Sequence, residues 1–244
     1  MAPAGYGDRV EGIHAVTAAV AAGRVEKLFV ETGRRSRVEH ILARVEASVV
    51  TYVDDVRSMA DTDAPQGVVA RCRPILPVTL DDLAGPAAAI LVLDHIEDPH
   101  NVGAVARSAR AAGSTGLVVS GRRAAPLSAA AFKAAAGALE DLPVAIVTSI
   151  PEALRRLKER GVWIVGLDAG GGRSLFGLDL LTEPVAVVVG AEGAGLAQLT
   201  RKRCDVVTSI PMVVGTESLN ASVSAALASF EIMRVRNVQA GDSP

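Results

Sequence analysis

The chain has 244 residues, half of them hydrophobic and only 3% aromatic, with a formal net charge of −2. This length can bury one substantial core, or one core and a smaller satellite domain, and the apolar content excludes an intrinsically disordered chain. The near-neutral charge excludes a polycation that binds nucleic acid through its net charge alone.

No apolar run approaches the roughly 18–20 residues that a membrane span needs, and the first residues lack the pattern of a signal peptide. Cys72 and Cys204 lie far apart without a CxxC context, so neither a zinc site nor a disulfide scaffold is indicated. We expect a cytoplasmic protein without a metal. Basic residues cluster at residues 34–37, 122–123, 155–160 and 201–203. A single cluster of this kind is usually solvated, but several together are compatible with a polyanionic partner.

Short runs rich in Val, Ile and Leu alternate with longer stretches of helical periodicity, which is typical of βαβ units on a parallel sheet. The pattern predicts strands at residues 27–32, 49–53, 67–72, 88–94, 116–120, 144–148, 162–168, 184–190 and 205–211. It predicts helices at residues 14–22, 36–47, 101–112, 126–137, 151–160, 194–203 and 218–236. From this pattern alone we expect an open, doubly wound α/β sheet.

A break in the pattern falls at PILPVTLDDLAGPAA, which holds three prolines and a glycine between two strand-like runs. Proline and glycine interrupt regular structure, so this stretch predicts a linker. We expect a small α/β domain at residues 1–75, the linker at 76–87, a larger α/β domain at 88–238 and a tail at 239–244.

The first stretch that could carry chemistry is LVLDHIEDPHNVGAVARSARAAG, residues 91–113, where a strand, a polar loop and a helix follow one another. Asn101 is a good N-cap for that helix, and Arg107 lies off its apolar stripe, where a side chain is ordinarily solvated. In a parallel sheet, however, the loop after a strand's carboxyl end is where ligands bind. Asn101 and Arg107 are therefore candidates for a binding site.

The second stretch is PVAVVVGAEGAGL, residues 184–196, where a buried strand runs into a glycine-rich turn. Its glycines follow G-x-x-G-x-G and come late in the chain, so the dinucleotide fingerprint G-x-G-x-x-G is not supported. A glycine-rich turn lets a ligand approach the backbone closely. The lone carboxylate of Glu192 is more often a helix cap, and is otherwise a candidate site residue.

The third stretch is IPMVVGTESLNASVSAA, residues 210–226. Its apolar residues predict a helix that begins near residue 218 or 220, so Ser218 or Asn220 can cap it, a contribution of about 1 kcal/mol. One cap is enough, and the polar groups of residues 216–220 exceed that need. The surplus favours a functional role. The apolar stripe comprises Leu219, Val223, Ala226, Leu227, Phe230 and Met233.

In this order, the stretches DPHNVGAVARSARAAG, VVVGAEGAGL and IPMVVGTESLNASVSAA resemble the SpoU (TrmH/RlmB) family of RNA ribose 2′-O-methyltransferases. The stretches GIHAV and PQGVVARC resemble that family's small substrate-binding domain, which is similar to a ribosomal L30e-type protein. The resemblance spans nearly the whole chain. It implies a SPOUT-type parallel sheet with a C-terminal deep trefoil knot, an L30e-like N-terminal α/β domain, and a homodimer involving the C-terminal helix.

The resemblance also implies roles for individual residues. Asn101 and Arg107 match the family's first motif, Glu192 the second, and Ser218 and Asn220 the third. The cofactor is S-adenosylmethionine, contacted largely through the backbone at Gly190, Ile210 and Leu219. The chain departs from the family at Val214, where a glycine is common, with Gly215 one residue later and Thr216 where a valine is common.

The implied activity is methylation of a ribose 2′-hydroxyl in structured RNA. A guanosine of 23S ribosomal RNA is favoured, because the tRNA branch of the family commonly lacks the small N-terminal domain. The family's arginine is often described as a base, but a guanidinium keeps its proton up to about pH 12. We therefore expect Arg107 to bind the target phosphate and stabilise the alkoxide, while Glu192 orients Arg107 or Asn101.

Four alternatives remain from the sequence. They are a tRNA 2′-O-methyltransferase, an rRNA methyltransferase of the thiostrepton-resistance type, a non-catalytic RNA-binding module, and an NAD enzyme of the Rossmann type. The intact set of candidate residues argues against the third. The order of the glycines argues against the fourth.

Overall fold

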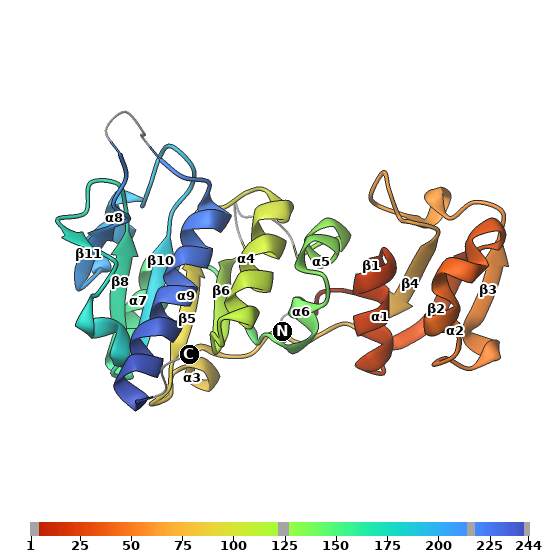
Figure 1. Ribbon diagram of the computed structural model, residues 1–244, viewed down its shortest axis with the longest axis horizontal. Helices are drawn as coiled ribbons and strands as arrows, with labels where there is room; N and C mark the ends of the chain where they lie inside the picture. The colour runs from red at the N-terminus through yellow and green to blue at the C-terminus, as the bar shows by residue number, and fades with distance from the viewer. Residues whose placement is uncertain (1–4, 122–126, 214–217, 242–244) are drawn as a thin grey trace.

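Two β-sheets organise the computed structural model, which describes residues 5–121, 127–213 and 218–241 (Figure 1). The larger sheet has seven strands in the order β7-β6-β5-β10-β8-β11-β9, all parallel. They are β5 (Ala89–Leu93), β6 (Gly116–Ser120), β7 (Val144–Val147), β8 (Trp163–Leu167), β9 (Arg173–Ser174), β10 (Val185–Val189) and β11 (Val206–Ser209). The predicted parallel α/β sheet is confirmed, although the two-residue strand β9 is too short for its pattern to be detected.

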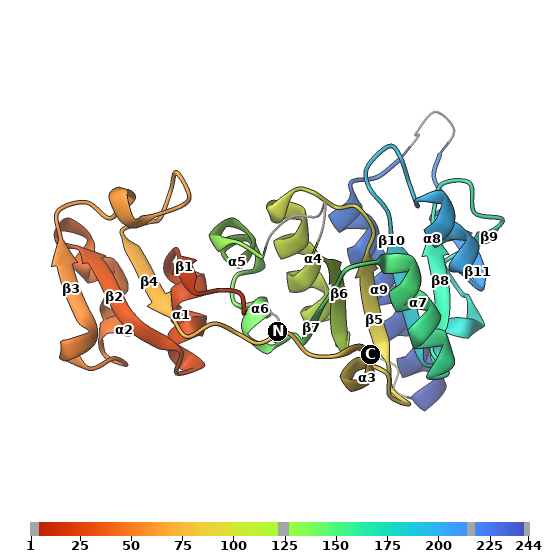
Figure 2. The same ribbon diagram turned by 180° about the vertical axis from the view of Figure 1, so that it is seen from behind.

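Helices cover both faces of this sheet, which explains the uninterrupted apolar sequences of β5 and β10. Helices α4 (Pro99–Ala111) and α9 (Ala221–Ala240) pack on one face, where Leu91 belongs to their cluster. On the other face Ile90 packs with α3 (Leu80–Leu83) and α7 (Ile150–Glu159), next to α8 (Gln198–Arg203) (Figure 2). The other short helices of this region are α5 (Ala129–Ala135), α6 (Ala138–Asp141) and η4 (Asp179–Thr182).

The central strands of the large sheet end at one level. Val189 at the end of β10 lies opposite both Leu93 of β5 and Leu167 of β8. The residues that follow, Asp94, Gly190 and Asp168, therefore leave the sheet side by side at its carboxyl edge. This is the edge at which ligands bind in open parallel sheets.

The smaller sheet is mixed, with the order β1-β4-β2-β3. Strand β4 (Val68–Cys72) is antiparallel to β1 (Arg9–Glu11) and β2 (Val25–Glu31), and only β2 and β3 (Val50–Val53) are parallel. Here the prediction of parallel βαβ units holds only for β2 and β3, because β4 returns antiparallel beside β2. The associated helices are α1 (Ile13–Ala21), η1 (Thr32–Val38), α2 (Glu39–Leu42), η2 (Ala47–Val49) and η3 (Arg57–Met59). The single helix predicted at 36–47 is thus several short pieces.

Two other local predictions change. Helix α4 begins at Pro99 and is capped by Asp98, whose carboxylate accepts a hydrogen bond from the His100 amide at 2.9 Å. The prediction of Asn101 as the N-cap is therefore wrong, since Asp followed by Pro gives an earlier start. The segment predicted as a linker contains α3, which has a capping box between Thr79 and Asp82 and two buried leucines.

Helix α9 begins at Ala221 rather than at residue 218. Its inner face consists of the small residues Ala221, Ala225 and Ala228 together with Ile232, which lets it approach α4 and the sheet closely. Two large residues of the stripe used to predict this helix, Val223 and Phe230, are 46% and 44% exposed. Within the described ranges, no helix is both long and apolar enough to cross a bilayer.

Candidate active site

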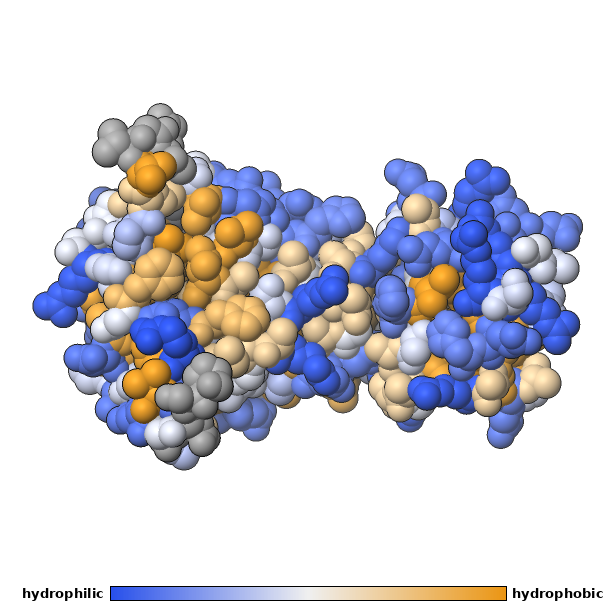
Figure 3. All heavy atoms as spheres, viewed as in Figure 1, coloured by the Kyte–Doolittle hydropathy of each residue, from blue (hydrophilic) through white to orange (hydrophobic). Residues whose placement is uncertain are grey.

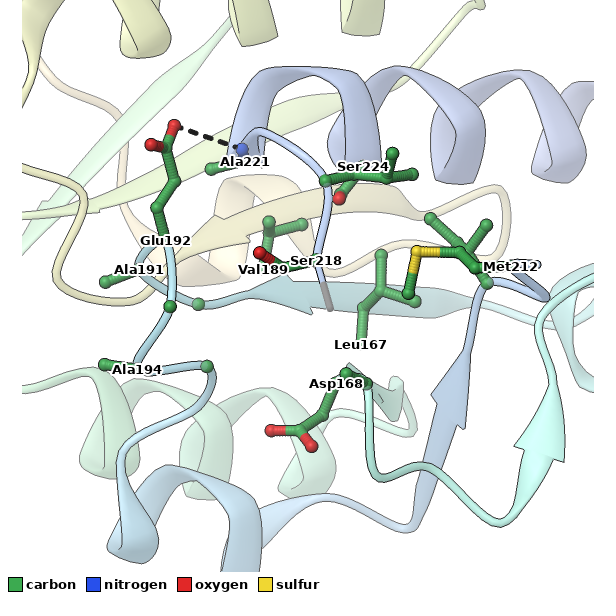
Figure 4. A pocket seen from close by; sticks show the side chains of 16 residues that line it. Leu167, Asp168, Val189, Ala191, Glu192, Ala194, Met212, Ser218, Ala221 and Ser224 are labelled. Atoms are coloured by element: carbon green, nitrogen blue, oxygen red, sulfur yellow. Dashed lines mark hydrogen bonds between the residues drawn. The ribbon is translucent and has the colours of Figure 1, made fainter. Parts of the chain in front are cut away.

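A cavity of about 220 Å³ opens at the carboxyl edge of the large sheet (Figure 4). The loops after β8, β10 and β11 form its wall, and the start of α9 closes it. All three residues predicted to contact a cofactor, Gly190, Ile210 and Leu219, line this cavity, as does Ser218. Further lining residues are Leu167, Asp168, Val189, Glu192, Met212, Ala221 and Ser224.

Gly190 lets two segments of backbone meet beneath the cavity. A Cβ atom at this position would lie 2.2 Å from the carbonyl oxygen of Gly195, far inside van der Waals contact. The turn is closed by a hydrogen bond from the Gly195 amide to the Ala191 carbonyl oxygen at 2.9 Å. A side chain would force this turn open, so a glycine is required here.

Asp168 fixes two of the loops around the cavity. Its carboxylate pairs with Arg201 at 2.7 Å and accepts hydrogen bonds from the amides of Gly170 at 2.9 Å and Leu196 at 3.3 Å. Burial of this carboxyl raises its pKa, but the bonds from Arg201 and the two amides outweigh burial and hold the pKa below its usual value. Asp168 therefore ties the loop after β8 to the glycine-rich turn.

A cluster of polar side chains borders the cavity and joins three distant parts of the sequence. Oε1 of Glu192 accepts hydrogen bonds from Nδ2 of Asn101 at 3.1 Å and from Nδ2 of Asn220. Nδ2 of Asn220 also donates to Oδ1 of Asn101 at 3.1 Å. The same Glu192 oxygen accepts from the Ala221 amide at 3.4 Å, the bond drawn in Figure 4. Glu192 is thus both a cap of α9 and the centre of the cluster.

Asn220 has two functions at once. Its Oδ1 accepts from the Ser222 amide at 2.8 Å and caps α9, while its Nδ2 reaches the cluster. Of the two caps that the sequence left open, Asn220 is the one found. Ser218 is exposed and lines the cavity without capping the helix.

Arg107 lies apart from this cluster. It is exposed on α4, and it is not among the residues that line the cavity. Six positions on a helix correspond to about 9 Å of rise, so Arg107 is well removed from Asn101 along α4. The structure therefore brings together Asn101, Glu192 and Asn220, and Glu192 contacts Asn101 rather than Arg107.

A second cavity, of about 370 Å³, lies on the other side of Glu192. It shares Ala191, Glu192 and Ala221 with the first and is otherwise lined by residues 95–98 and Asn101. The polar cluster thus separates two adjoining spaces. Such an arrangement can hold a donor on one side and an acceptor on the other.

Sequence reasoning missed Asp168 and Met212 as residues of the cavity wall. Asp168 had a signal, because it directly follows a buried strand just as Asp94 does. The departure at Val214, Gly215 and Thr216 lies outside the described residues. Among those described, no group of three or more His, Cys, Asp or Glu side chains could hold a metal ion.

Comparison with known proteins identifies the family. The model of the "SpoU rRNA Methylase family" matches residues 88–230, and a model of "RNA 2′-O ribose methyltransferase substrate binding" matches residues 9–77. The chain belongs to the SpoU rRNA methylase family. The first of these matches contains the whole polar cluster, and the resemblance inferred from the three motifs is confirmed.

Relatives of this SpoU chain cover most of its length. A protein of Ralstonia nicotianae named 23S rRNA (guanosine-2′-O-)-methyltransferase RlmB is 38% identical over 93% of this chain and 95% of its own. An uncharacterized tRNA/rRNA methyltransferase of Mycobacterium tuberculosis is 39% identical over 86% of this chain and 68% of its own.

Solved structures agree with this assignment. The SpoU methyltransferase AviRb from Streptomyces viridochromogenes has a TM-score of 0.80 and 28% identity, covering 95% of this chain and 90% of its own. The same enzyme in complex with the cofactor AdoMet also has a TM-score of 0.80, at 28% identity, covering 93% of this chain and 89% of its own.

Proposed function

We propose that this chain is an S-adenosylmethionine-dependent methyltransferase that acts on a ribose 2′-hydroxyl of ribosomal RNA, with a guanosine of 23S rRNA as the target. The observation that carries this proposal is the polar cluster of Asn101, Glu192 and Asn220, which lies between two adjoining cavities at the carboxyl edge of the sheet. The 23S rRNA target rests on the relatives with that printed activity.

The first cavity suits S-adenosylmethionine. Leu167, Ile210 and Leu219 provide apolar wall, and the close backbone approach at Gly190 leaves the amides of residues 190–195 near the space. A molecule with an apolar ring face and polar groups that need backbone partners fits this lining. When bound, the cofactor supplies a methyl group already activated by its sulfonium.

The chain's own residues then position the acceptor. We assign Asn101, Asn220 and Ser218 to binding the ribose and its phosphate, with Glu192 holding both amides in place. Orientation of this kind can supply on the order of 7–11 kcal/mol of a barrier. Because Oε1 of Glu192 accepts hydrogen bonds from both side-chain amides and from the Ala221 amide, we assign Glu192 to positioning these groups.

Arg107 is assigned to the target phosphate and to the charge that develops on the ribose oxygen. Its exposed side chain has no ion-pair partner among the described residues, so it is available to an anion. A guanidinium remains protonated in proteins and is suited to stabilise an oxyanion rather than to remove a proton. The distance along α4 between Arg107 and Asn101 fits a substrate that spans both.

We further propose the C-terminal trefoil knot. Strand β10 lies between β5 and β8, and β11 lies beyond β8, yet α9 packs against α4 and β5 on the other side. The position of α9 on the far side of β8 from β11 supports this proposal. An experimental electron-density trace of residues 190–221 tests this path.

A homodimer formed through α9 is proposed from the outer face of that helix. Figure 3 shows apolar residues gathered over α9. Two large apolar residues of this helix, Val223 and Phe230, are exposed. An exposed apolar face of this kind marks a protein–protein interaction surface. Sedimentation velocity of Phe230→Glu, expected to give monomer where the wild type gives dimer, tests this.

We assign a different function to each of the two sheet-containing regions. We assign residues 1–75 to an L30e-like domain that binds RNA and residues 88–238 to methyl transfer, in a cytoplasmic protein. The match of residues 9–77 to a substrate-binding family supports the first assignment. Mapping of ultraviolet crosslinks to RNA onto residues 1–75 tests it.

Gly190→Ala tests the cofactor site directly. The new Cβ would collide with the Gly195 carbonyl, so we expect calorimetry to show loss of S-adenosylmethionine binding. Gly172→Ala, in an exposed loop with open space around the new atom, should bind as the wild type does. Equal binding by both variants, or wild-type methyl transfer to a base instead of a ribose oxygen, would reject the proposal.

A further inference from the structure

A buried ion pair joins the part of the chain that carries the small sheet to the part that carries the large one. The guanidinium of Arg24, just before β2, donates to both carboxylate oxygens of Glu140 in α6, each at 2.7 Å. The two side chains are only 11% and 3% exposed. Among the ion pairs of the described residues, this one alone connects the two regions matched by the two family models.

We call the Arg24–Glu140 pair and its backbone partners the joint. Arg24 also binds the backbone of the small-sheet region. It donates to the carbonyl oxygens of Gly7, at 3.0 Å, and Arg73, the two segments that lead into and out of the small sheet. A planar guanidinium bound in this way has one orientation, because its donors are arranged as a rigid fork. The pair therefore fixes an angle as well as a distance.

The surroundings of the pair are largely buried. The Arg24 guanidinium lies 6.0 Å from the centre of the Phe132 ring of α5, which in turn contacts Tyr6. Burial raises the pKa of the Tyr6 hydroxyl and of the Cys72 thiol to about 12 each. Removing one partner of such an ion pair lowers the free energy of unfolding strongly, because the other charge would remain buried and unpaired.

The joint is continuous with the catalytic helix. Helix α5 packs directly on α4, and a Cβ atom at Gly103 of α4 would lie 2.3 Å from the Ala131 carbonyl oxygen. Asn101 and Arg107 lie on either side of Gly103 on the same helix. A second bond, from Nζ of Lys133 in α5 to the Ala64 carbonyl oxygen, holds the small-sheet loop against α5.

We propose that Arg24 and Glu140 are positioning residues that hold the RNA-binding region in one pose relative to α4, so that an RNA bound there presents its ribose at the Asn101 cluster. Interfaces between domains of one chain usually permit motion unless they are large and apolar. Here one apolar cluster runs across the boundary, from Val10 of the small sheet to Phe132 of α5, and the bidentate ion pair adds a fixed angle to that contact. This inference rests on the proposed function, since it assumes an RNA that spans both regions.

The test separates pose from activity. Spin labels at Ala47→Cys and Arg156→Cys, in a Cys204→Ala background, report the distance between the two sheets. Buried Cys72 stays unlabelled.

Steady-state methyl transfer to protein-free 23S rRNA gives KM and kcat. Variants are Arg24→Met, Glu140→Gln and the charge exchange Arg24→Glu with Glu140→Arg. Arg9→Met, which breaks an exposed ion pair within the small-sheet region, is the control.

For Arg24→Met and Glu140→Gln we expect a broadened distance distribution and a KM for RNA raised about tenfold, with kcat and cofactor affinity within about twofold. The charge exchange should restore a narrow distribution and most of the KM. An unchanged KM despite broadened distances, or a rise in KM equal to that of Arg9→Met, overturns the proposal. A wild-type protein that binds no S-adenosylmethionine would instead reject the proposed function, while the distances would still test the joint.

Discussion

Carboxylates hold loops at both sheets, but they do so in different ways. In the small mixed sheet, Glu11 is fully buried, and its carboxylate accepts from the amides of Asp61 and Thr62 and from the Thr62 hydroxyl. All of its partners belong to one loop, which it holds in place. In the large parallel sheet, Asp168 and Glu192 also bind loops, but both line the same cavity.

The difference follows from strand direction. In the parallel sheet, β5, β10 and β8 all end at one edge, so the loops after them meet. In the small sheet, β4 is antiparallel to both of its neighbours, so its end lies at the opposite edge from theirs. The same residue types therefore stabilise one loop beside the small sheet and build a shared site at the edge of the large sheet.

Arg107 should give the largest effect. We expect Arg107→Ala to lower kcat by about 10³-fold, the upper range for loss of one group that stabilises developing charge. Cofactor affinity should stay within about twofold, because Arg107 does not line the cofactor cavity. Single-turnover methyl transfer and calorimetry measure the two.

Two further substitutions sharpen that test. Arg110→Ala, on the same helix but paired with Asp141, is the control and should retain activity. Arg107→Lys keeps the charge but loses the planar fork. If the lysine variant retains near-wild-type rates at all pH values, a role specific to arginine is wrong.

Asn220→Ala should remove both a helix cap and a partner of Glu192. We expect a loss of about 1 kcal/mol in the free energy of unfolding from the cap, and a fall of about 10²-fold in kcat from the cluster. Ser149→Ala removes the side-chain cap of α7 on the opposite face and should lose stability alone. Equal rates for both variants would mean that Asn220 is only a cap.

Asp168→Asn should have a moderate effect. We expect cofactor affinity to fall about tenfold, which is the size of one charge-assisted hydrogen bond. The folded-state pKa of Asp168 is lowered, so its contribution to stability is present above the unfolded value of about 3.9 and disappears as pH falls through the folded value. Urea unfolding should therefore separate wild type and variant at pH 6 and bring them together at strongly acidic pH.

Glu11→Gln should leave the site unchanged. Replacing a carboxylate oxygen by an amide NH₂ places a donor against donors, at a cost of about 1–3 kcal/mol in the free energy of unfolding. Cofactor affinity and kcat at saturating RNA should match the wild type. A change in cofactor affinity would contradict the contrast between the two sheets.

The sequence predicted the strands of the large sheet closely, because uninterrupted Val, Ile and Leu runs are diagnostic when both faces are covered. It also indicated Gly190, Ile210, Leu219 and Ser218, which line one cavity. It misplaced the start of α4, since Asn101 was used as the cap although Asp98 followed by Pro99 is a local signal for an earlier start. The hydrogen bonds among Asn101, Glu192 and Asn220 depend on tertiary structure that periodicity cannot show.

Packing also decides which face of α9 is inside. The helix is apolar on most sides, so periodicity indicated the large residues Val223 and Phe230 rather than the alanines that contact α4 and the sheet. Close approach between helices favours small side chains, which a hydropathy pattern ranks below large ones. The joint at Arg24 was missed for a similar reason, because its partner Glu140 is distant in the chain.

The central claim is methylation of a ribose in 23S rRNA at the carboxyl edge of the parallel sheet. The most direct test maps 2′-O-methyl groups in cellular rRNA and tRNA with and without this protein, and after complementation with wild type or Asn220→Ala. We predict that one 23S rRNA site loses its methyl group without the protein and regains it only with the wild type. Loss of a tRNA methyl group with no change in rRNA, or full restoration by Asn220→Ala, would contradict the account.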